Sequence, residues 1–355
     1  MRQFQRIFIA LWPAILSFAL PAADVPALRH ATVAQAEPHK NNNAPNGLIG
    51  QPILGYITQS SPLRLRAILG VPGSAVLSGA MLLPANTARV HLAPGQAYAL
   101  AERRNDDPAV VVLKAGSAGT AIPVDGAIQT PDVVAFSPTG QSALLWSATA
   151  GLQVIGGLPG TPAIVRTVGA AAFPKAIQDA AVSDDGDSVL LASEGGAYQL
   201  LRDGTTRQVI SSADSAALAF LPNSSQAAIG DRRAGSVYLW VTGTGQGSAS
   251  LLSTGLAGLD IMRATVDGQS LWITNPGGNS VWQLDIRTGG VRTFSLPVSP
   301  VSLDRLPYGE ISLISSAPGQ PTWILLSQGD HASAVFVPAA REKLRDIYKP
   351  GGPKR

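Results

Sequence analysis

A unit of about 43 residues recurs along most of the sequence. Each copy holds an apolar stretch, a turn rich in Pro, Asp and Gly, and a second apolar stretch, and such a repeat constrains the fold more than any single element does. The turns are centred on positions that lie 38 to 46 residues apart along the chain: Gly95, Gly140, Gly186, Ser224, Gly268 and Gly309.

The chemistry of these turns is that of tight hairpins. Glycine supplies the positive φ that such a hairpin needs, and Asp-Gly is a strong short-range hairpin signal. Asp185-Gly186 and Asp267-Gly268 both fit this pattern. Ser224 departs from glycine, although its surroundings, Pro-Asn-Ser-Ser, are still typical of a turn.

Two further strand-like runs follow each hairpin, for example SVWQLDI and GVRTFSL in the fifth unit. Four short strands in 40 to 45 residues are typical of one blade of a β-propeller. Residues 51–337 hold between six and seven such units. We therefore predict an all-β β-propeller, with seven four-stranded blades over residues 51–337. A ring of six blades with an extra N-terminal hairpin is the alternative.

One unit also resembles a known repeat family. The run LWITNPGGNSVWQLDIRTGGVRTFSLP, which begins at Leu271, is similar to the YVTN type of propeller repeat. The turns SPTG and SDDGD resemble those of WD-like repeats in secreted bacterial propellers. The resemblance implies a propeller fold and export, but it does not fix an activity.

The two ends of the chain differ from the repeats. Arg2 and Arg6 precede a short apolar core, and small residues follow up to Ala36, which is the pattern of a secretory signal peptide. We predict a cleaved signal peptide over residues 1–36 and a periplasmic or secreted protein. Cleavage near Ala22 or Ala23, and an uncleaved anchor, are alternatives. We expect no transmembrane segment in the mature chain, because no later apolar run is long enough.

Residues 37–50 are polar and rich in Pro and Asn, which predicts a disordered lead-in. Residues 338–355 carry an excess of Lys and Arg, and within them REKLRDIY predicts a short helix in a basic tail. The net charge of +3 comes from these two ends, because residues 51–337 hold more acidic than basic side chains. A nucleic-acid-binding fold would gather basic charge on its body, so we expect no nucleic-acid partner.

The composition limits the chemistry. The absence of Cys excludes disulfide scaffolds, thiolate zinc sites and iron–sulfur clusters. Only His91 and His331 lie within the repeats, together with three Glu. We therefore predict no catalytic residue, no metal ligand and no cofactor. An enzyme of the propeller lactonase or lyase type, acting in the central channel, is the alternative, and it requires two or more acids near His91.

The sequence instead favours a non-enzymatic scaffold that binds a protein or a cell-envelope component. Loops between second and third strands carry partners in rigid rings. The predicted partner-binding residues all lie on three such loops: Arg103, Arg104, Asp106, Asp107, Asp231, Arg232, Arg233, Asn275 and Asn279. These loops could also be ordinary solvated hairpin tips, and a structural subunit of an envelope assembly is a third interpretation.

Overall fold

The structure is a computed structural model that describes most of residues 52–340. The segments left out within this range are residues 116–120, 174–176, 213, 215, 242–246, 309–310, 316–318 and 329–330. The predicted signal peptide, lead-in and tail helix lie outside the described residues. None of the helices in the described part is long and apolar enough to cross a membrane.

Seven antiparallel sheets make up the fold, and each is a blade of consecutive strands. Blade 1 consists of β1 (Ile53–Ser60), β2 (Leu63–Val71) and β3 (Ser74–Leu77). Blade 2 consists of β4 (Thr87–Leu92), β5 (Tyr98–Arg103), β6 (Val110–Lys114) and β7 (Ala121–Val124). Blade 3 consists of β8 (Val133–Phe136), β9 (Ala143–Ser147), β10 (Gly151–Gly156) and β11 (Ala163–Val168). Blade 4 consists of β12 (Ile177–Val182), β13 (Val189–Ser193), β14 (Gly196–Leu200) and β15 (Thr206–Ser211).

The remaining three blades repeat this order. Blade 5 consists of β16 (Ala216–Phe220), β17 (Gln226–Asp231), β18 (Ser236–Val241) and β19 (Ser248–Ser253). Blade 6 consists of β20 (Met262–Ala264), β21 (Ser270–Asn275), β22 (Ser280–Asp285) and β23 (Val291–Ser295). Blade 7 is β24 (Asp304–Arg305), β25 (Ile311–Ser315), β26 (Thr322–Gln328) and β27 (His331–Val337). Two short 3₁₀ turns, η1 (Ala170–Ala172) and η2 (Pro276–Gly278), complete the described elements.

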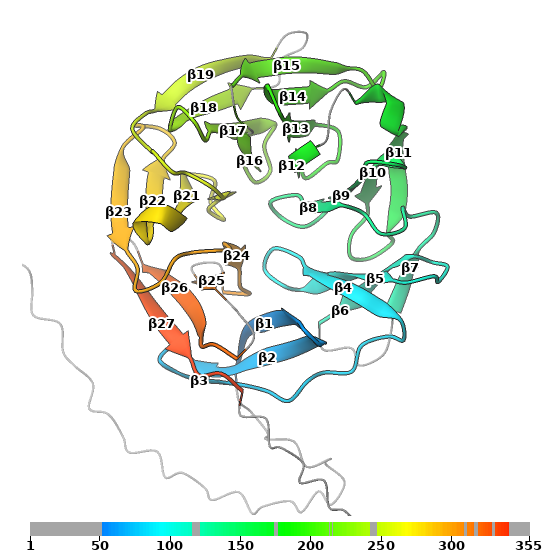
Figure 1. The fold of residues 1–355 in the computed structure, drawn as a ribbon, viewed down its shortest axis with the longest axis vertical. Coiled ribbons are helices and arrows are strands. Elements are labelled where there is room, and N and C mark those ends of the chain that lie inside the picture. The colour runs from blue at the N-terminus through cyan, green and yellow to red at the C-terminus, as the bar shows by residue number, and fades with distance from the viewer. Residues whose placement is uncertain are drawn as a thin grey trace, which may run out of the picture. The chain divides into compact units, whose positions relative to one another are not determined.

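Figure 1 shows the blades arranged in a ring, with the first strand of each blade toward the centre. The predicted all-β seven-bladed propeller is therefore confirmed, and the rival ring of six blades is wrong. Blade 1 pairs three strands among the described residues, whereas the other six blades pair four.

The hydrophobic core is distributed between the blades. Blades 2 and 3 share a cluster that includes Leu100 and Leu145, and blades 5 and 6 share one that includes Val237 and Ile273. Similar clusters fill the seams between blades 3 and 4, 4 and 5, and 6 and 7. Because each blade buries its two faces against its neighbours, the alternation of apolar residues along the strands is what drives ring formation.

The hairpins between first and second strands adopt the predicted left-handed geometry. Gly140, Gly186 and Gly268 have φ values of 77°, 76° and 69°. In the fourth unit the residue with positive φ is Asn223, at 51°, and not Ser224 as the spacing predicts. Asn adopts the left-handed conformation more readily than other residues with a Cβ, so it takes the place of glycine one residue earlier.

Candidate functional site

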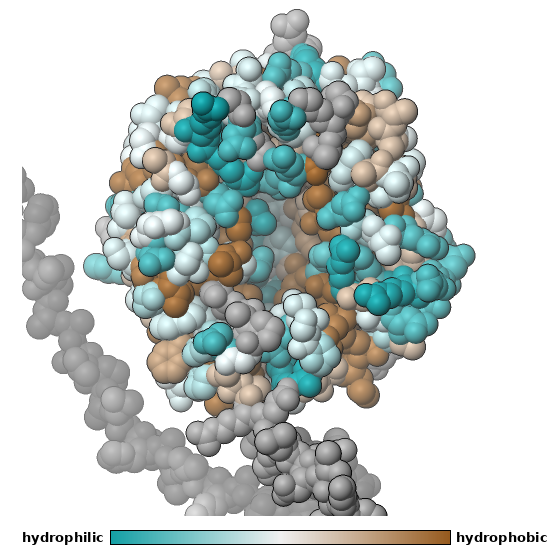
Figure 2. All heavy atoms as spheres, viewed as in Figure 1, coloured by the Kyte–Doolittle hydropathy of each residue, from teal (hydrophilic) through white to brown (hydrophobic). Residues whose placement is uncertain are grey.

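The innermost strands enclose a cavity of about 890 Å³ at the centre of the ring. Residues from all seven blades line it, and Figure 2 shows the hollow that it makes in one face of the molecule. Small-molecule sites have volumes of roughly 300–1,000 Å³, so the cavity has the size of such a site.

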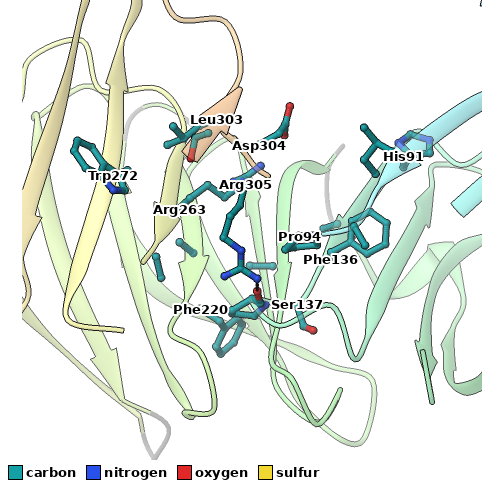
Figure 3. A pocket seen from close by; sticks show the side chains of 18 of the residues that line it. His91, Pro94, Phe136, Ser137, Phe220, Arg263, Trp272, Leu303, Asp304 and Arg305 are labelled. Carbon is teal, nitrogen blue, oxygen red and sulfur yellow. Dashed lines mark hydrogen bonds between the residues drawn. The ribbon is translucent and has the colours of Figure 1, made fainter. Parts of the chain in front are cut away.

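Most of its wall is apolar, with Phe136, Phe220 and Trp272 among the larger side chains (Figure 3). Against this wall stands a small group of ionisable side chains: His91, Asp179, Arg263, Asp267, Asp304 and Arg305. An apolar cavity with a few converging polar groups is the usual composition of a ligand site.

The charge of Arg263 acts on two carboxyl groups that line the channel, those of Asp179 and Asp304. Surrounding protein raises the pKa of both carboxyl groups, and the positive charge of Arg263 opposes this rise in each case. Arg263 uses Nη1 to donate to the carbonyl of Met262 at 2.8 Å. Asp304 remains accessible to water within the channel. One cationic and two acidic side chains therefore line the same cavity.

Asp179 also has a structural role. Its Oδ1 accepts a hydrogen bond from Ala180 N at 2.9 Å, and its Oδ2 accepts one from Leu218 N at 3.2 Å. The second bond ties β12 to β16 of the next blade. The two backbone donors fix the carboxylate at the channel wall, where it faces the charge of Arg263.

Arg305 crosses the channel. Its Nη2 donates to the carbonyl of Pro138 at 3.1 Å, which lies in the β8–β9 turn three blades away (Figure 3). Burial lowers the pKa of this guanidinium, and the charge of Asp184 opposes that shift. The side chain therefore narrows the channel at the end where the Asp/Gly hairpins lie, and a ligand would enter from the opposite face.

His91 lies on β4, across the cavity from Arg263 and Trp272 (Figure 3). Its Nε2 is 2.6 Å from Oε1 of Glu102 on the adjacent strand β5. The Glu102 side chain is only 3% exposed, and Arg89 approaches the same oxygen at 3.8 Å. The structure thus places two acids, Asp179 and Asp304, in one cavity with His91, which is the condition that the enzymatic alternative requires.

No group of three or more His, Asp or Glu among the described residues is placed to hold a metal ion. The acidic run Asp184-Asp185-Gly186-Asp187 is used in hydrogen bonding instead. Asp184 accepts from Thr139 N at 2.8 Å and from Asn223 N at 2.7 Å, which joins the hairpins of blades 3, 4 and 5.

The predicted partner-binding residues lie on the β5–β6, β17–β18 and β21–β22 loops of blades 2, 5 and 6. Several of them stabilise their own loops. Arg103 forms an ion pair of 2.7 Å with Asp106, and Asp231 accepts hydrogen bonds from the backbone of Arg233 and Ala234. Asn275 accepts from Gly278 N at 3.0 Å.

Arg232 donates to the carbonyls of Ala216 and Asp260, so its side chain is also engaged within the ring. The exposed members of the predicted set are Arg104, Asp107, Arg233 and Asn279. The loops that carry Arg104 and Arg233 belong to blades 2 and 5, three steps apart around the ring. Arg103, Asp106, Arg232 and Asn275 are only partly exposed.

The channel residues carry a sequence signal that motif reasoning misses. Asp179, Arg263 and Asp304 each stand in an innermost strand next to at least one apolar residue, and each lies five or seven residues before the hairpin position of its unit. The two faces of an innermost strand pack against the neighbouring blades. A charged side chain at such a position in the repeat is therefore expected to point into the channel. Once the repeats are aligned, this offset could have found them.

The sequence matches no protein-family model, and no curated protein matches it. Many solved structures share its fold, among them the following two. The periplasmic gluconolactonase of Pseudomonas aeruginosa aligns with a TM-score of 0.53 and 14% identity, over 81% of this chain and 96% of its own. A protein of Bacteroides fragilis described as a putative 6-phosphogluconolactonase aligns with a TM-score of 0.53 and 12% identity, over 83% and 98%. At these identities the likeness shows the fold alone.

Proposed function

We propose that the central channel binds and hydrolyses a small, hydroxylated lactone. The observation that carries this proposal is the presence of His91, Asp179, Arg263 and Asp304 on the wall of one central cavity. The two solved structures named above are described as gluconolactonases, which favours a sugar-acid lactone as the first substrate to test.

Each part of the cavity would have a definite task. The guanidinium of Arg263 offers several N–H donors to a carbonyl or carboxylate oxygen, and it would stabilise negative charge that develops there. The carboxylates of Asp179 and Asp304 would accept hydrogen bonds from substrate hydroxyls. Trp272 and Phe136 would pack against the carbon faces of a sugar-like ring.

The test is acid release from glucono-δ-lactone, followed at constant pH and corrected for spontaneous hydrolysis. The Arg263→Met variant keeps the length of the side chain and removes its charge. We expect kcat/KM to fall by about 100-fold or more, since loss of one donor to a developing oxyanion costs that much in other enzymes. Arg287→Met is the matched control, because Arg287 is exposed in the β22–β23 turn outside the cavity. A wild-type protein that neither hydrolyses lactones nor binds gluconate would overturn the proposal.

We also propose that the protein is exported and that its repeats belong to the YVTN-like type. The signal-peptide pattern of residues 1–36 supports export, and one protein of the same fold is described as periplasmic. Mass spectrometry of the exported protein should find Glu37 as its first residue. An intact Met1 on cytoplasmic material would contradict export.

A scaffold that binds a protein or an envelope component is the second candidate function. The observation that favours it is the exposure of Arg104 and Arg233 on loops of one ring in a chain with few charges. Replacing both by Ser should leave the fold intact, because exposed substitutions cost within about 0.5 kcal/mol each. Capture of a periplasmic partner should weaken most at low salt, where charge attraction is least screened. Capture that is unchanged would leave these loops as solvated tips.

A further inference from the structure

The pair formed by His91 and Glu102 joins a residue of the cavity wall to a buried carboxylate. Glu102 is almost fully buried, yet its Oε2 has no hydrogen-bond partner in the described structure. A buried carboxylate oxygen without a partner is costly, and such groups concentrate at functional sites. The other oxygen, Oε1, is committed to His91 Nε2 at 2.6 Å.

This contact orients the imidazole. With Glu102 as a carboxylate, which can only accept a hydrogen bond, Nε2 is the donor of the contact. In the neutral ring Nδ1 then holds the lone pair. Nδ1 makes no hydrogen bond with any described residue, while the His91 side chain is 27% exposed and lines the cavity.

We propose that His91 is the general base of the channel and that Glu102 is its positioning residue. The inference rests on the proposed lactone hydrolysis and identifies its proton acceptor. A histidine that lines a cavity and is held by a buried carboxylate is the arrangement that activates water or a hydroxyl in many hydrolases.

The reaction balances without a further reagent. Nδ1 of His91 takes a proton from water as the water oxygen forms a bond to the lactone carbonyl carbon. The carbonyl electron pair moves onto its oxygen, whose charge Arg263 stabilises. When the carbonyl re-forms, the ring C–O bond breaks, and the departing oxygen takes the proton back from His91. The product is a hydroxy acid, which releases its proton to solvent.

The experiment compares three variants with the wild-type protein: His91→Gln, Glu102→Gln and, as a matched control, His331→Gln. His331 is exposed on β27 and lies outside the cavity. Two quantities are measured for each protein, namely kcat for glucono-δ-lactone across pH and the Kd for gluconate by calorimetry. Thermal melting confirms that each variant is folded.

We expect His91→Gln to lower kcat by about 100-fold or more, the usual contribution of a general base, with the Kd for gluconate little changed. Glu102→Gln should lower kcat by a smaller factor. It should also move the acidic limb of the pH–rate profile to lower pH, because a neutral amide no longer stabilises the imidazolium. A purely structural role for Glu102 would not move this limb.

The two proposals fail differently. If the wild-type protein hydrolyses the lactone and His91→Gln does so equally fast, the assignment of the base is wrong and the channel function stands. If His91→Gln loses activity only together with gluconate binding, His91 is a binding residue and the assignment is again wrong. If the wild-type protein shows neither hydrolysis nor binding, both proposals fall.

Discussion

Asp179 combines a structural and an electrostatic role in a single side chain. Two backbone N–H groups hold its carboxylate, and burial nevertheless raises its pKa above the ordinary value of 3.8. A charged group is therefore kept in the channel wall at some cost in stability. Residues of this kind are typical of functional sites, where stability is given up for chemistry.

The raised pKa of Asp179 predicts that the free energy of unfolding depends on pH. Because its pKa is raised by folding, Asp179 binds its proton more tightly in the folded than in the unfolded state. Its contribution is then most favourable below pH 3.8 and is lost as pH rises through the raised value. The Asp179→Asn variant cannot ionise at this position. Its free energy of unfolding should therefore lie further below that of the wild-type protein at pH 4 than at pH 7. Urea unfolding at the two pH values measures the change.

Asp285 provides a control of opposite sign. Hydrogen bonds from Thr288 lower the pKa of its carboxyl group, so its contribution is present above the unfolded value and is lost in acid. Asp285→Asn should therefore become less stable relative to wild type as pH rises. The same pH trend in both variants would contradict this account.

At the scale of the element, the hairpins between first and second strands form one recurring structure. In blades 3, 4 and 6, Ser137, Ser183 and Thr265 each begin a hairpin in which the side-chain oxygen accepts from the backbone N–H five residues later. The glycine three residues after each of them donates back to its carbonyl. A short polar side chain and a left-handed residue at fixed spacing are thus what the repeat conserves within this chain.

Valine at the glycine of such a hairpin should destabilise the protein. Gly140→Val and Gly268→Val would force a β-branched residue into the left-handed region, at about 1–3 kcal/mol each. Ser224→Val should cost less, because the neighbouring Asn223 carries the positive φ in that unit. Gly169→Val is a control with an extended backbone and no atom within 4 Å of the added Cβ. Chemical denaturation gives each value, and equal losses in all four variants would refute the shared geometry.

The elements were predictable from the sequence because their signals are local. Turn residues and apolar alternation act within about ten residues, so six units could be recognised from the sequence. The choice between six and seven blades needed the structure. The channel site was not predictable in the same way. His91 and Glu102 meet only because β4 pairs with β5 in a particular register, and Arg263 faces His91 only because the ring has seven blades.

At the scale of the whole molecule, the described strands include none that is shared between the first and last blades. Blade 7 completes its own four strands, and blade 1 packs against it through Leu54, Ile57, Leu306 and Ile324. On its other side blade 1 is held by the side chain of Gln96, which bonds both the N–H and the carbonyl of one residue of β1. Among the described residues, side-chain packing holds blade 1 to blade 7, and the two Gln96 hydrogen bonds hold it to blade 2.

Gly55 lies where these contacts meet. A Cβ at this position would stand 2.7 Å from Cδ2 of Leu306 and 2.7 Å from Oε1 of Gln96. Neither side chain can yield easily, because Leu306 is fully buried and Gln96 is fixed at both ends of its amide. Gly55→Val should therefore open the seam and destabilise the protein by about 1–3 kcal/mol, as overpacking does elsewhere.

Hydrogen exchange locates that loss. Amides of β1–β3 should exchange faster in Gly55→Val than in the wild-type protein, while those of β16–β19 on the far side of the ring change least. Gly79→Val is the matched control, because nothing lies within 4 Å of a Cβ there. If Gly55→Val accelerates exchange equally in all blades, the ring opens as one cooperative unit and the seam is not its weakest point. If it leaves both melting and exchange unchanged, closure does not depend on this contact.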